Sequence, residues 1–210
     1  MQSLHPFRGS IQEYLQALSD PKCYRPNHCP LCHELHPLRA HGFYCRTLVD
    51  VSYEGTIRVR RYLCLLCKRT VSLLPELVLP YLRFSIRVIA LFLVSRLLCG
   101  RTLREAAGAV LQPKMPYQRG QFWVRRFQQQ ARALCAALAS LTSVPPASDF
   151  LIRAFQMLKA IGWVAAHRFL FTRLRVHLLG WPRFLRPHGL PGQVIAGFVP
   201  PLAVNTQHLS

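Results

Sequence analysis

Hydrophobic and polar residues alternate along this chain with two different periods, and each period predicts a different kind of element. Over residues 43–63 the period is two, because apolar positions (Ile57, Val59 and Leu63) alternate with polar or aromatic ones (Arg58, Arg60 and Tyr62). With its β-branched and aromatic residues, this stretch predicts a β-hairpin with strands at 43–52 and 56–63 and a turn at 53–55. A third short strand is expected in "RTVSLL" (69–74).

From Ser85 onward the period lengthens to three or four residues, which is typical of helices packed on one face. Ser85 predicts the N-cap of a first helix that runs to Leu98 and is stopped by Gly100. Thr102 and Glu105 have the spacing of a capping box, in which two side chains satisfy backbone N–H groups reciprocally. They predict a second, shorter helix.

A third and longer helix is expected from Tyr117 to about Leu141. Its buried stripe follows the three- to four-residue spacing: Gly120, Val124, Phe127, Ala131, Leu134, Leu138 and Leu141. Away from that stripe, near the helix start, lie Gln118, Phe122, Arg125 and Arg126, with Arg119 and Gln121 on the flanks. Such a series of helices is typical of a helix-turn-helix, in which the start of the recognition helix meets base edges. A small helical bundle with solvated arginines would show the same pattern.

The charge of the chain indicates a polyanionic partner. The formal net charge is +19 and the isoelectric point is about 10.7, with 23 arginines and only 4 lysines. Residues 81–180 alone carry a net charge of +13. Nucleic acid is the commonest partner of such a chain, and an anionic membrane surface is the alternative. Arginine suits bidentate contact with phosphate or guanine better than lysine does.

No segment has the pattern of a membrane span or of a secretory signal. The most apolar run, "VIALFLV" (88–94), lies between Arg87 and Arg96 and falls far short of the roughly 18–20 residues that a span needs. The first 18 residues lack an apolar core and a small-residue cleavage site. We therefore expect a cytoplasmic protein without integral membrane association, whose thiols stay reduced.

Two cysteine pairs have the spacing of metal-binding knuckles, Cys29-Pro-Leu-Cys32 and Cys64-Leu-Leu-Cys67. Two such turns, each facing both its sulfurs toward one ion, complete a tetrahedral zinc site. A redox pair would instead open a helix after a strand, and neither pair does so. We predict one structural Zn²⁺ per chain, with the four knuckle cysteines as ligands. Nearby histidines could replace one ligand (His28, His33, His36 and His41). The other cysteines are expected to be buried thiols (Cys23, Cys45, Cys99 and Cys135).

The quoted motifs resemble a known group. "CPLC…HGFYCR…RVRRYLCLLCKRTVSLLPELVLPYLRFS", followed by "GRTLREAAGAV", is similar to prokaryotic transposase-like proteins that join a zinc ribbon to a helix-turn-helix. Some members of that group are known only as a domain of unknown function. The resemblance covers roughly residues 27–140 and implies DNA binding. The chain departs from it at Lys68, where glycine is usual, and at "YQRGQ" (117–121), where Ser-Thr is usual.

The acidic residues do not indicate an enzyme. A two-metal transposase needs about three carboxylates around its ions, and after the third helix only Asp149 remains. Serine and tyrosine recombinases need a larger domain around the nucleophile. We therefore expect a sequence-reading DNA-binding protein of transposase-like type that lacks a catalytic domain. The alternatives are an accessory or remnant subunit of a transposition system and an RNA-binding zinc ribbon protein.

The predicted fold class is α+β, a small β zinc ribbon followed by a mostly α helix-turn-helix bundle. The expected segments are an N-terminal extension (1–26), the ribbon (27–80), the helix-turn-helix (81–142), an accessory helical region (149–180) and an irregular tail (181–210). The accessory region packs on the bundle, forms a dimer or lies on a membrane surface. Expected partners are double-stranded DNA and either a second copy or a transposition protein. The expected DNA contacts are Arg58, Arg60, Arg101, Arg104, Gln118, Arg119, Gln121, Phe122, Arg125 and Arg126.

Overall fold

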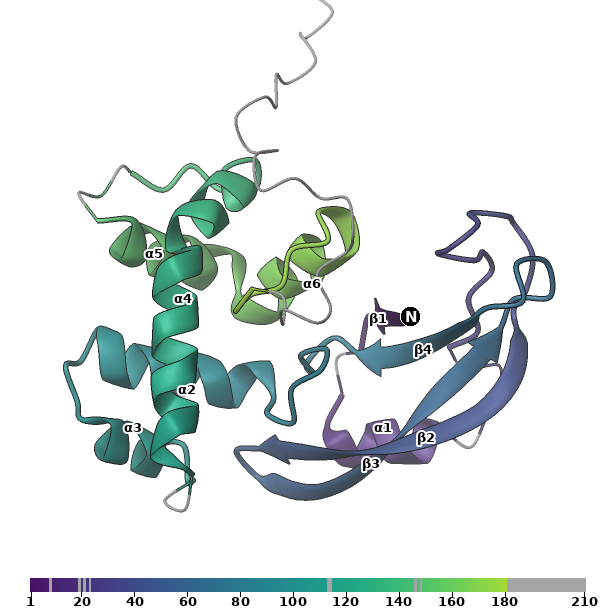
Figure 1. The fold of residues 1–210 in the computed structure, drawn as a ribbon, viewed down its shortest axis with the longest axis horizontal. Coiled ribbons are helices and arrows are strands. Elements are labelled where there is room, and N and C mark those ends of the chain that lie inside the picture. Colours follow the sequence, from purple (N-terminus) through teal and green to yellow (C-terminus); the bar gives the residue numbers. More distant parts are fainter. Residues whose placement is uncertain are drawn as a thin grey trace, which may run out of the picture. The chain divides into compact units, whose positions relative to one another are not determined.

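The computed structural model describes residues 1–180 with the exception of Arg8, Ser19, Pro21, Cys23, Pro113, Lys114, Pro146 and Ser148. The predicted tail, 181–210, lies outside the described residues. The strands are β1 (Gln2–His5), β2 (Arg39–Asp50), β3 (Tyr53–Leu63) and β4 (Thr70–Pro75) (Figure 1). The helices are α1 (Ile11–Ala17), α2 (Ile86–Leu97), α3 (Leu103–Ala109), α4 (Tyr117–Leu138), α5 (Phe150–Ile161) and α6 (Trp163–Arg173). The predicted α+β class is confirmed.

The strands form one sheet in the order β1-β4-β3-β2. The predicted hairpin is present as the antiparallel pair β2 and β3, and the predicted third strand is β4, antiparallel to β3. Residues 1–26, to which the sequence analysis gave no element, supply the edge strand β1, which runs parallel to β4 with Gln2 opposite Ser72. They also supply α1, whose capping box joins Ser10 and Glu13.

The predicted hairpin turn at 53–55 is wrong. Strands β2 and β3 remain paired up to Asp50 and Tyr53, so that residues 51–52 form the turn. Gly55, which suggested the turn, lies inside β3 opposite Leu48. The ring of Tyr53 covers it, and a Cβ atom at this glycine would lie 2.8 Å from the Tyr53 hydroxyl oxygen. A two-residue loop is the commonest hairpin connection, and glycine in a strand often marks the close approach of another group.

The helix starts that the sequence predicts are confirmed. Ser85 caps α2, because its hydroxyl accepts a hydrogen bond from the Val88 N–H at 3.2 Å. Thr102 and Glu105 form the capping box of α3, with reciprocal hydrogen bonds of 3.2 and 2.8 Å. Helix α4 begins at Tyr117 as expected and ends at Leu138 rather than near residue 141.

The buried face of α4 differs from the predicted stripe. Trp123 is fully buried, whereas Val124 is half-buried and Leu141 is 43% exposed beyond the helix end. The indole ring meets Phe84 and Phe92 edge to face, at centroid distances of 4.9 and 5.2 Å. This aromatic group lies in the core shared by α2, α3 and α4. Sequence spacing favoured Val124 over Trp123 as the buried residue, because the two are neighbours and both fit a spacing of three or four residues.

The segment between β4 and α2 is held by the hairpin rather than extended as a free linker. The Arg46 guanidinium donates to the carbonyl oxygens of Leu79, at 3.3 Å, and of Leu82. The Val49 N–H donates to the Arg83 carbonyl at 2.7 Å, and the Ser85 N–H donates to the Val49 carbonyl at 2.9 Å. Backbone bonds therefore attach the closed end of the β2–β3 hairpin directly to the start of α2.

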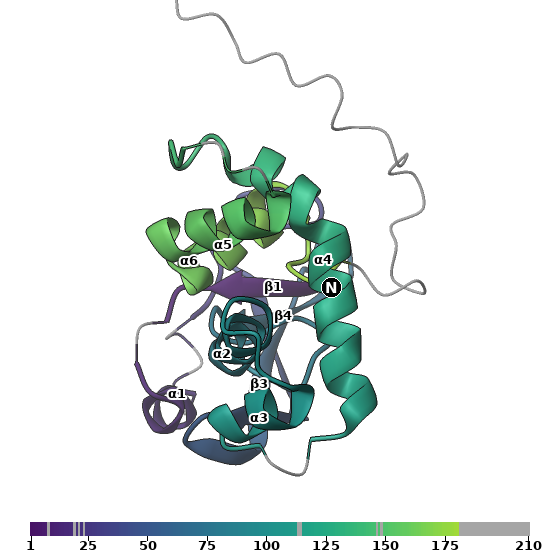
Figure 2. The same cartoon turned by 90° about the vertical axis from the view of Figure 1, so that its left-hand side faces the viewer.

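Residues 149–180 form a helix pair that packs on α2 and α4 (Figures 1 and 2). Gly162, with φ of +88°, separates α5 from α6 in a conformation that favours glycine. Phe155 of α5 and Leu170 of α6 belong to the same core as Trp123. Packing on the bundle is therefore confirmed for this region, while dimerisation stays a prediction. Within the described residues, no helix combines the length and the apolar character that crossing a bilayer requires.

Two buried histidines lie in this helical core. His167 is fully buried, and neither of its ring nitrogens has a hydrogen-bond partner among the described residues. His177 is paired, because its Nε2 lies 3.1 Å from the Pro80 carbonyl and its Nδ1 accepts from the Leu179 N–H at 3.2 Å. Burial lowers the pKa of His167 to about 3 and that of His177 to about 4. Both are neutral at pH 7.

We expect the free energy of unfolding to decrease as the pH falls from 7 to 5. Both folded-state pKa values lie below the unfolded value, so the unfolded chain takes up protons first. At pH 5 each histidine costs up to about 2 kcal/mol. His167→Leu should reduce this slope in urea titrations at pH 7, 6 and 5, whereas His41→Leu, at an exposed position, should not. An equal decrease in the free energy of unfolding in the wild type and in His167→Leu would contradict the attribution of this pH dependence to His167.

Candidate metal centre and basic surface

The second knuckle is the loop that joins β3 to β4. The last paired residues are Leu63 and Thr70, and the six residues between them carry both cysteines. The Cys64 N–H donates to the Arg69 carbonyl at 3.0 Å and closes the loop. Because both strands belong to the sheet, this pair of thiols has a fixed position at the end of β3.

The first knuckle lies just before β2 and is closed in the same way. The Cys29 N–H donates to the Glu34 carbonyl at 3.0 Å, five residues on, as in the second knuckle. Strand β2 begins at Arg39, directly opposite Leu63 at the end of β3. Pairing of these two strands therefore brings the first knuckle to the end of the sheet that carries the second.

Each knuckle requires a left-handed residue directly after its second cysteine. His33 has φ of +62° and Lys68 has φ of +56°. Side chains disfavour this region because Cβ crowds the following carbonyl, and glycine does not. The glycine that is usual after the second knuckle in the resembling proteins therefore has a geometric reason, and Lys68 occupies the position at a conformational cost.

Lys68→Gly is expected to raise the stability of the metal-bound protein by about 1 kcal/mol. The gain arises because the backbone of residue 68 has a φ of +56°, which is strained for lysine and not for glycine. The lysine side chain that is lost is exposed. The measurement is the midpoint of chemical unfolding at constant metal content. Arg69→Gly, one residue on and without a positive φ, is the matched control and should lower stability. A loss of stability in Lys68→Gly would contradict this account.

The four predicted cysteines come together with the separations that a tetrahedral ion requires. Their Sγ atoms all lie within 4.8 Å of one another. The Sγ atoms of Cys29 and Cys67 are 3.8 Å apart, and those of Cys32 and Cys64 are 3.7 Å apart. Metal–sulfur bonds of about 2.3 Å give a tetrahedron whose edges are about 3.8 Å long. The cluster can therefore hold one metal ion.

Hydrogen bonds distinguish the thiols of the cluster. Burial raises the pKa of Cys64, but the backbone N–H groups of Cys67 and Leu66 and the His36 ring outweigh it and lower the value to about 6. The His36 Nε2 lies 3.2 Å from the Cys64 Sγ. Cys32 differs, because burial and the other three thiols outweigh its backbone hydrogen bond and raise its pKa to about 12. Cys64 is thus presented to a cation as thiolate more readily than Cys32.

His36 is the residue near the cluster whose role the sequence did not single out. Four histidines follow or flank the first knuckle at similar spacing, and the sequence offers no means to choose among them. In the structure the His36 Nδ1 lies 3.3 Å from the Pro37 carbonyl while Nε2 faces the Cys64 sulfur. It lies beside the four thiols as a hydrogen-bonding neighbour.

Only a small apolar core surrounds the cluster. Besides Cys29 and Cys64, its buried members are Leu38, Tyr62, Val71 and Leu73. Burial of so few side chains contributes little against the entropy of ordering two knuckles. A bound ion is therefore expected to supply much of the stability at this end of the sheet.

The remaining cysteines fit the sequence prediction only in part. Cys135 is buried in α4, as expected. Cys45 and Cys99 are exposed, so the prediction of burial is wrong for both. Cys45 lies in β2 opposite Arg58, and Cys99 follows the C-cap of α2. Cys23 lies outside the described residues.

The predicted DNA contacts do not all lie on a free surface. Six of the ten are exposed: Arg58, Arg101, Arg104, Gln118, Gln121 and Arg125. Arg119 and Phe122 are half-buried, and the Arg126 Nε donates to the Leu179 carbonyl at 2.8 Å. Arg60 is only 9% exposed and donates to the Leu18 carbonyl at 2.8 Å, so it holds the end of α1.

The row of exposed polar residues on α4 extends beyond the contacts predicted from the sequence. Gln128 and Arg132 are exposed as well, and they follow Arg125 at spacings of three and seven residues. Together with Gln118 and Gln121 they form a single row of long polar side chains, called here the α4 stripe. The sequence signal for Gln128 and Arg132 is the same helical spacing of polar residues, followed past the first two turns of the helix.

Part of the chain matches a family of proteins whose function is not known. Residues 29–107 match a family described as a domain of unknown function (DUF6431). The match spans both knuckles, strands β2 to β4, all of α2 and the first part of α3, and it ends before α4. No curated protein and no solved structure matches the chain.

Proposed function

We propose that this chain is a zinc-containing, sequence-reading DNA-binding protein of transposase-like type without a catalytic domain. The observation that carries the proposal is the α4 stripe. Its members recur at alternating spacings of three and four residues along a 22-residue helix, and all of them are exposed: Gln118, Gln121, Arg125, Gln128 and Arg132. No acidic residue occurs anywhere in α4.

The chemistry of the stripe suits the edges of base pairs. The major groove admits an α-helix, glutamine can bond adenine through two atoms, and arginine can bond guanine in the same way. Gln118 and Gln121 lie in the first two turns of α4, where a recognition helix makes its base contacts. In this proposal α3 and α4 are the two helices of the helix-turn-helix, and Gly120 allows α4 to lie close against α2. A Cβ atom at Gly120 would lie 2.8 Å from the Phe92 ring of α2.

Phosphate contacts are assigned to arginines beside the stripe. Arg101 and Arg104 are exposed at the start of α3, on either side of its Thr102 cap. Arg58 is exposed on β3, and its guanidinium lies 4.1 Å from the centre of the Phe43 ring, which orients it. Such contacts supply affinity and register but no sequence information. Arg60 is left out of this set because its guanidinium is buried.

Zinc is the ion proposed for the cysteine cluster. Four thiolates at tetrahedral separations are the donor set that Zn²⁺ favours, and four protein ligands leave no open position for catalysis. The ion would fix the two knuckles and thereby the basic hairpin between them. The link to transposition rests on the resemblance of the ribbon and its linker, and it predicts a separate catalytic chain.

Selection of bound sequences from random duplex DNA tests the proposal on the full chain. We expect one recovered motif, whose affinity falls steeply with salt because phosphate contacts release counterions. Gln118→Ala and Gln121→Ala should relax the preference at particular base pairs, each by about 1–3 kcal/mol. Arg101→Gln and Arg104→Gln should weaken all sequences alike and reduce the salt slope by about one each.

Matched controls separate these contacts from general charge. Gln156→Ala on α5 and Arg173→Gln on α6 change exposed residues of the same types away from the stripe. They should leave both affinity and motif unchanged. Recovery of no motif, or equal losses in the stripe and control variants, would overturn the proposal. Tighter binding to structured RNA than to any duplex would favour the RNA alternative instead.

A further inference from the structure

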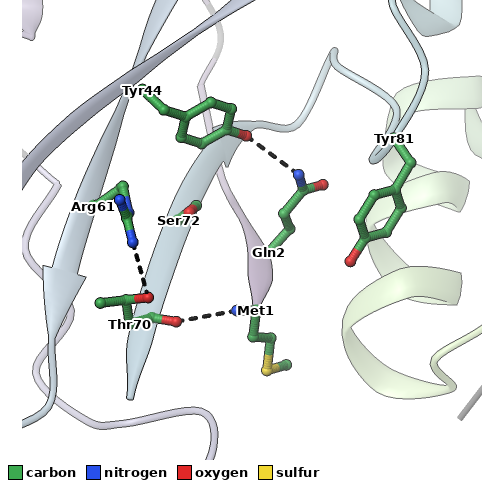
Figure 3. Close-up of a pocket in the computed structure, with 7 residues that line it drawn as sticks. All are labelled: Met1, Gln2, Tyr44, Arg61, Thr70, Ser72 and Tyr81. Carbon is green, nitrogen blue, oxygen red and sulfur yellow. Dashed lines mark hydrogen bonds between the residues drawn. The ribbon is translucent and has the colours of Figure 1, made fainter. Parts of the chain in front are cut away.

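One face of the sheet carries a small open cavity that the proposed duplex contact does not use. Its volume is about 310 Å³, and its lining contains no carboxylate: Met1, Gln2, Tyr44, Arg61, Thr70, Ser72 and Tyr81 (Figure 3). Five of these seven residues come from the four strands, Met1 directly precedes β1, and Tyr81 lies in the segment that follows β4. The volume lies at the lower end of the range for ligand pockets, about 300–1,000 Å³.

Strand pairing places three polar side chains in one row across the cavity. Arg61 lies opposite Ser72, and Ser72 lies opposite Gln2, so residues of β3, β4 and β1 share one face of the sheet. The Arg61 guanidinium donates to the Thr70 hydroxyl at 3.3 Å, which fixes its direction while its other N–H groups remain available. The cationic end of the cavity is therefore oriented before any ligand arrives.

The other end of the cavity presents an acceptor. The Gln2 Nε2 donates to the Tyr44 hydroxyl at 3.2 Å, whereas Gln2 Oε1 is buried and has no hydrogen-bond partner among the described residues. In Figure 3 this oxygen faces away from Tyr44, on the side of Tyr81. A buried carbonyl oxygen without a partner costs free energy that a ligand N–H would recover.

Two tyrosine rings border the space between these ends. Tyr44 comes from β2, and Tyr81 lies in the segment between β4 and α2 with φ of +64°. A residue other than glycine rarely adopts this conformation, and it persists where surrounding structure imposes it. Here it directs an exposed aromatic ring to the cavity border, as Figure 3 shows. Aromatic rings of this kind are stacking platforms for bases.

We propose that this cavity binds one nucleoside monophosphate unit, either as a free mononucleotide or as an unpaired nucleotide of a strand. The phosphate would meet Arg61 and the hydroxyl of Ser72, and a base amino or imino N–H would meet Gln2 Oε1. The base would lie against the tyrosine rings. The lining favours a ligand that has an anionic group at one end and a hydrogen-bond donor at the other. This site goes beyond the duplex contact of α4 and does not depend on it.

The test is titration calorimetry with the full metal-bound chain carrying Gln118→Ala, Gln121→Ala and Arg125→Ala, which removes three of the five side chains of the α4 stripe. The probes are the four deoxynucleoside monophosphates, a 5′-phosphorylated single-stranded decanucleotide and inorganic phosphate. We expect saturable binding at one site per chain. Arg61→Gln and Tyr81→Gly should each weaken it by about tenfold or more. Glycine accepts the backbone of Tyr81 without strain, so loss of its ring does not threaten the fold.

Arg173→Gln removes an exposed arginine on α6 and should leave nucleotide affinity unchanged. Mononucleotides that bind as tightly as the decanucleotide would assign the site to free nucleotides, and tighter binding of the decanucleotide would assign it to a strand. The proposal is overturned if no nucleotide binds, if inorganic phosphate binds equally well, or if Arg61→Gln and Tyr81→Gly leave affinity within about twofold. Because none of the probes is a duplex and three residues of the α4 stripe are replaced, none of these outcomes depends on duplex binding.

Discussion

Replacing Cys64 with serine is expected to abolish stoichiometric metal binding and to unfold the knuckle end of the sheet. Cys64 closes the β3–β4 loop through its N–H, and its sulfur accepts a hydrogen bond from the Cys67 N–H at 3.4 Å and lies 3.2 Å from the His36 Nε2. A structural zinc site of four thiolates carries about 10–16 kcal/mol of apparent binding free energy. The small core around the cluster cannot replace a contribution of that size.

The loss should be local rather than global. Helices α2 to α6 share a separate core, built around Trp123 and Phe127, that includes none of the knuckle residues. Amide hydrogen exchange should therefore rise sharply in residues 29–38 and 61–72 of Cys64→Ser while α4 remains protected. Metal content by mass spectrometry under native conditions gives the stoichiometry on the same sample.

Cys45→Ser is the matched control for this experiment. Cys45 is an exposed free thiol in the middle of β2, away from the cluster. Its replacement should leave one metal ion per chain and an unchanged exchange pattern. Retention of one ion by Cys64→Ser, or global unfolding in which α4 loses protection together with the knuckles, would contradict the separation of metal and helical cores.

The features that sequence predicted well are those set by short-range chemistry. Both knuckles and the Thr102–Glu105 capping box depend on residues within a few positions of one another, and the structure has them where the spacing indicated. The same holds for Ser85, whose hydroxyl caps α2. In each case the local hydrogen bonds or turn geometry leave little for the rest of the chain to decide.

The features that sequence missed depend on contacts between distant segments. Nothing near Gln2 indicates that residues 2–5 pair with β4, because a parallel edge strand has no turn to announce it. Arg60 fits the alternation of an exposed position, yet its guanidinium donates to the carbonyl of Leu18, the C-cap residue of α1. Arg46 likewise binds carbonyls more than thirty residues away. Such partners become visible only when the fold brings them together.

The candidate site divides along the same line. The sequence could name the four cysteines of the cluster but could not choose His36 among the nearby histidines, because that choice depends on the direction of a ring toward Cys64. The sequence could not predict the cavity beside Arg61 either, since its lining comes from four strands and the segment after β4. On α4, the sequence predicted the exposed stripe in part, and it did not predict the hydrogen bond from Arg126 to the Leu179 carbonyl.

Trp123→Ala is expected to destabilise the helical core by about 3–5 kcal/mol, the second largest effect after loss of the metal. The indole is fully buried between Phe84, which precedes α2, and Phe92 within it, so its removal leaves a cavity that two edge-to-face contacts bordered. Urea unfolding followed by circular dichroism at 222 nm measures the change. Tyr117→Ala, which removes a 62% exposed aromatic ring from the same helix, should cost less than about 1 kcal/mol.

Trp123→Phe provides the sharper comparison. The indole N–H has no hydrogen-bond partner among the described residues, so phenylalanine keeps most of the apolar contact and removes a buried donor. Its cost should be well below that of Trp123→Ala. Equal costs would show that the indole N–H contributes a bond of its own. Because α4 also carries the stripe, the proposed DNA binding should weaken in Trp123→Ala only at temperatures where the core unfolds, whereas in Gln118→Ala it should weaken in the fully folded protein.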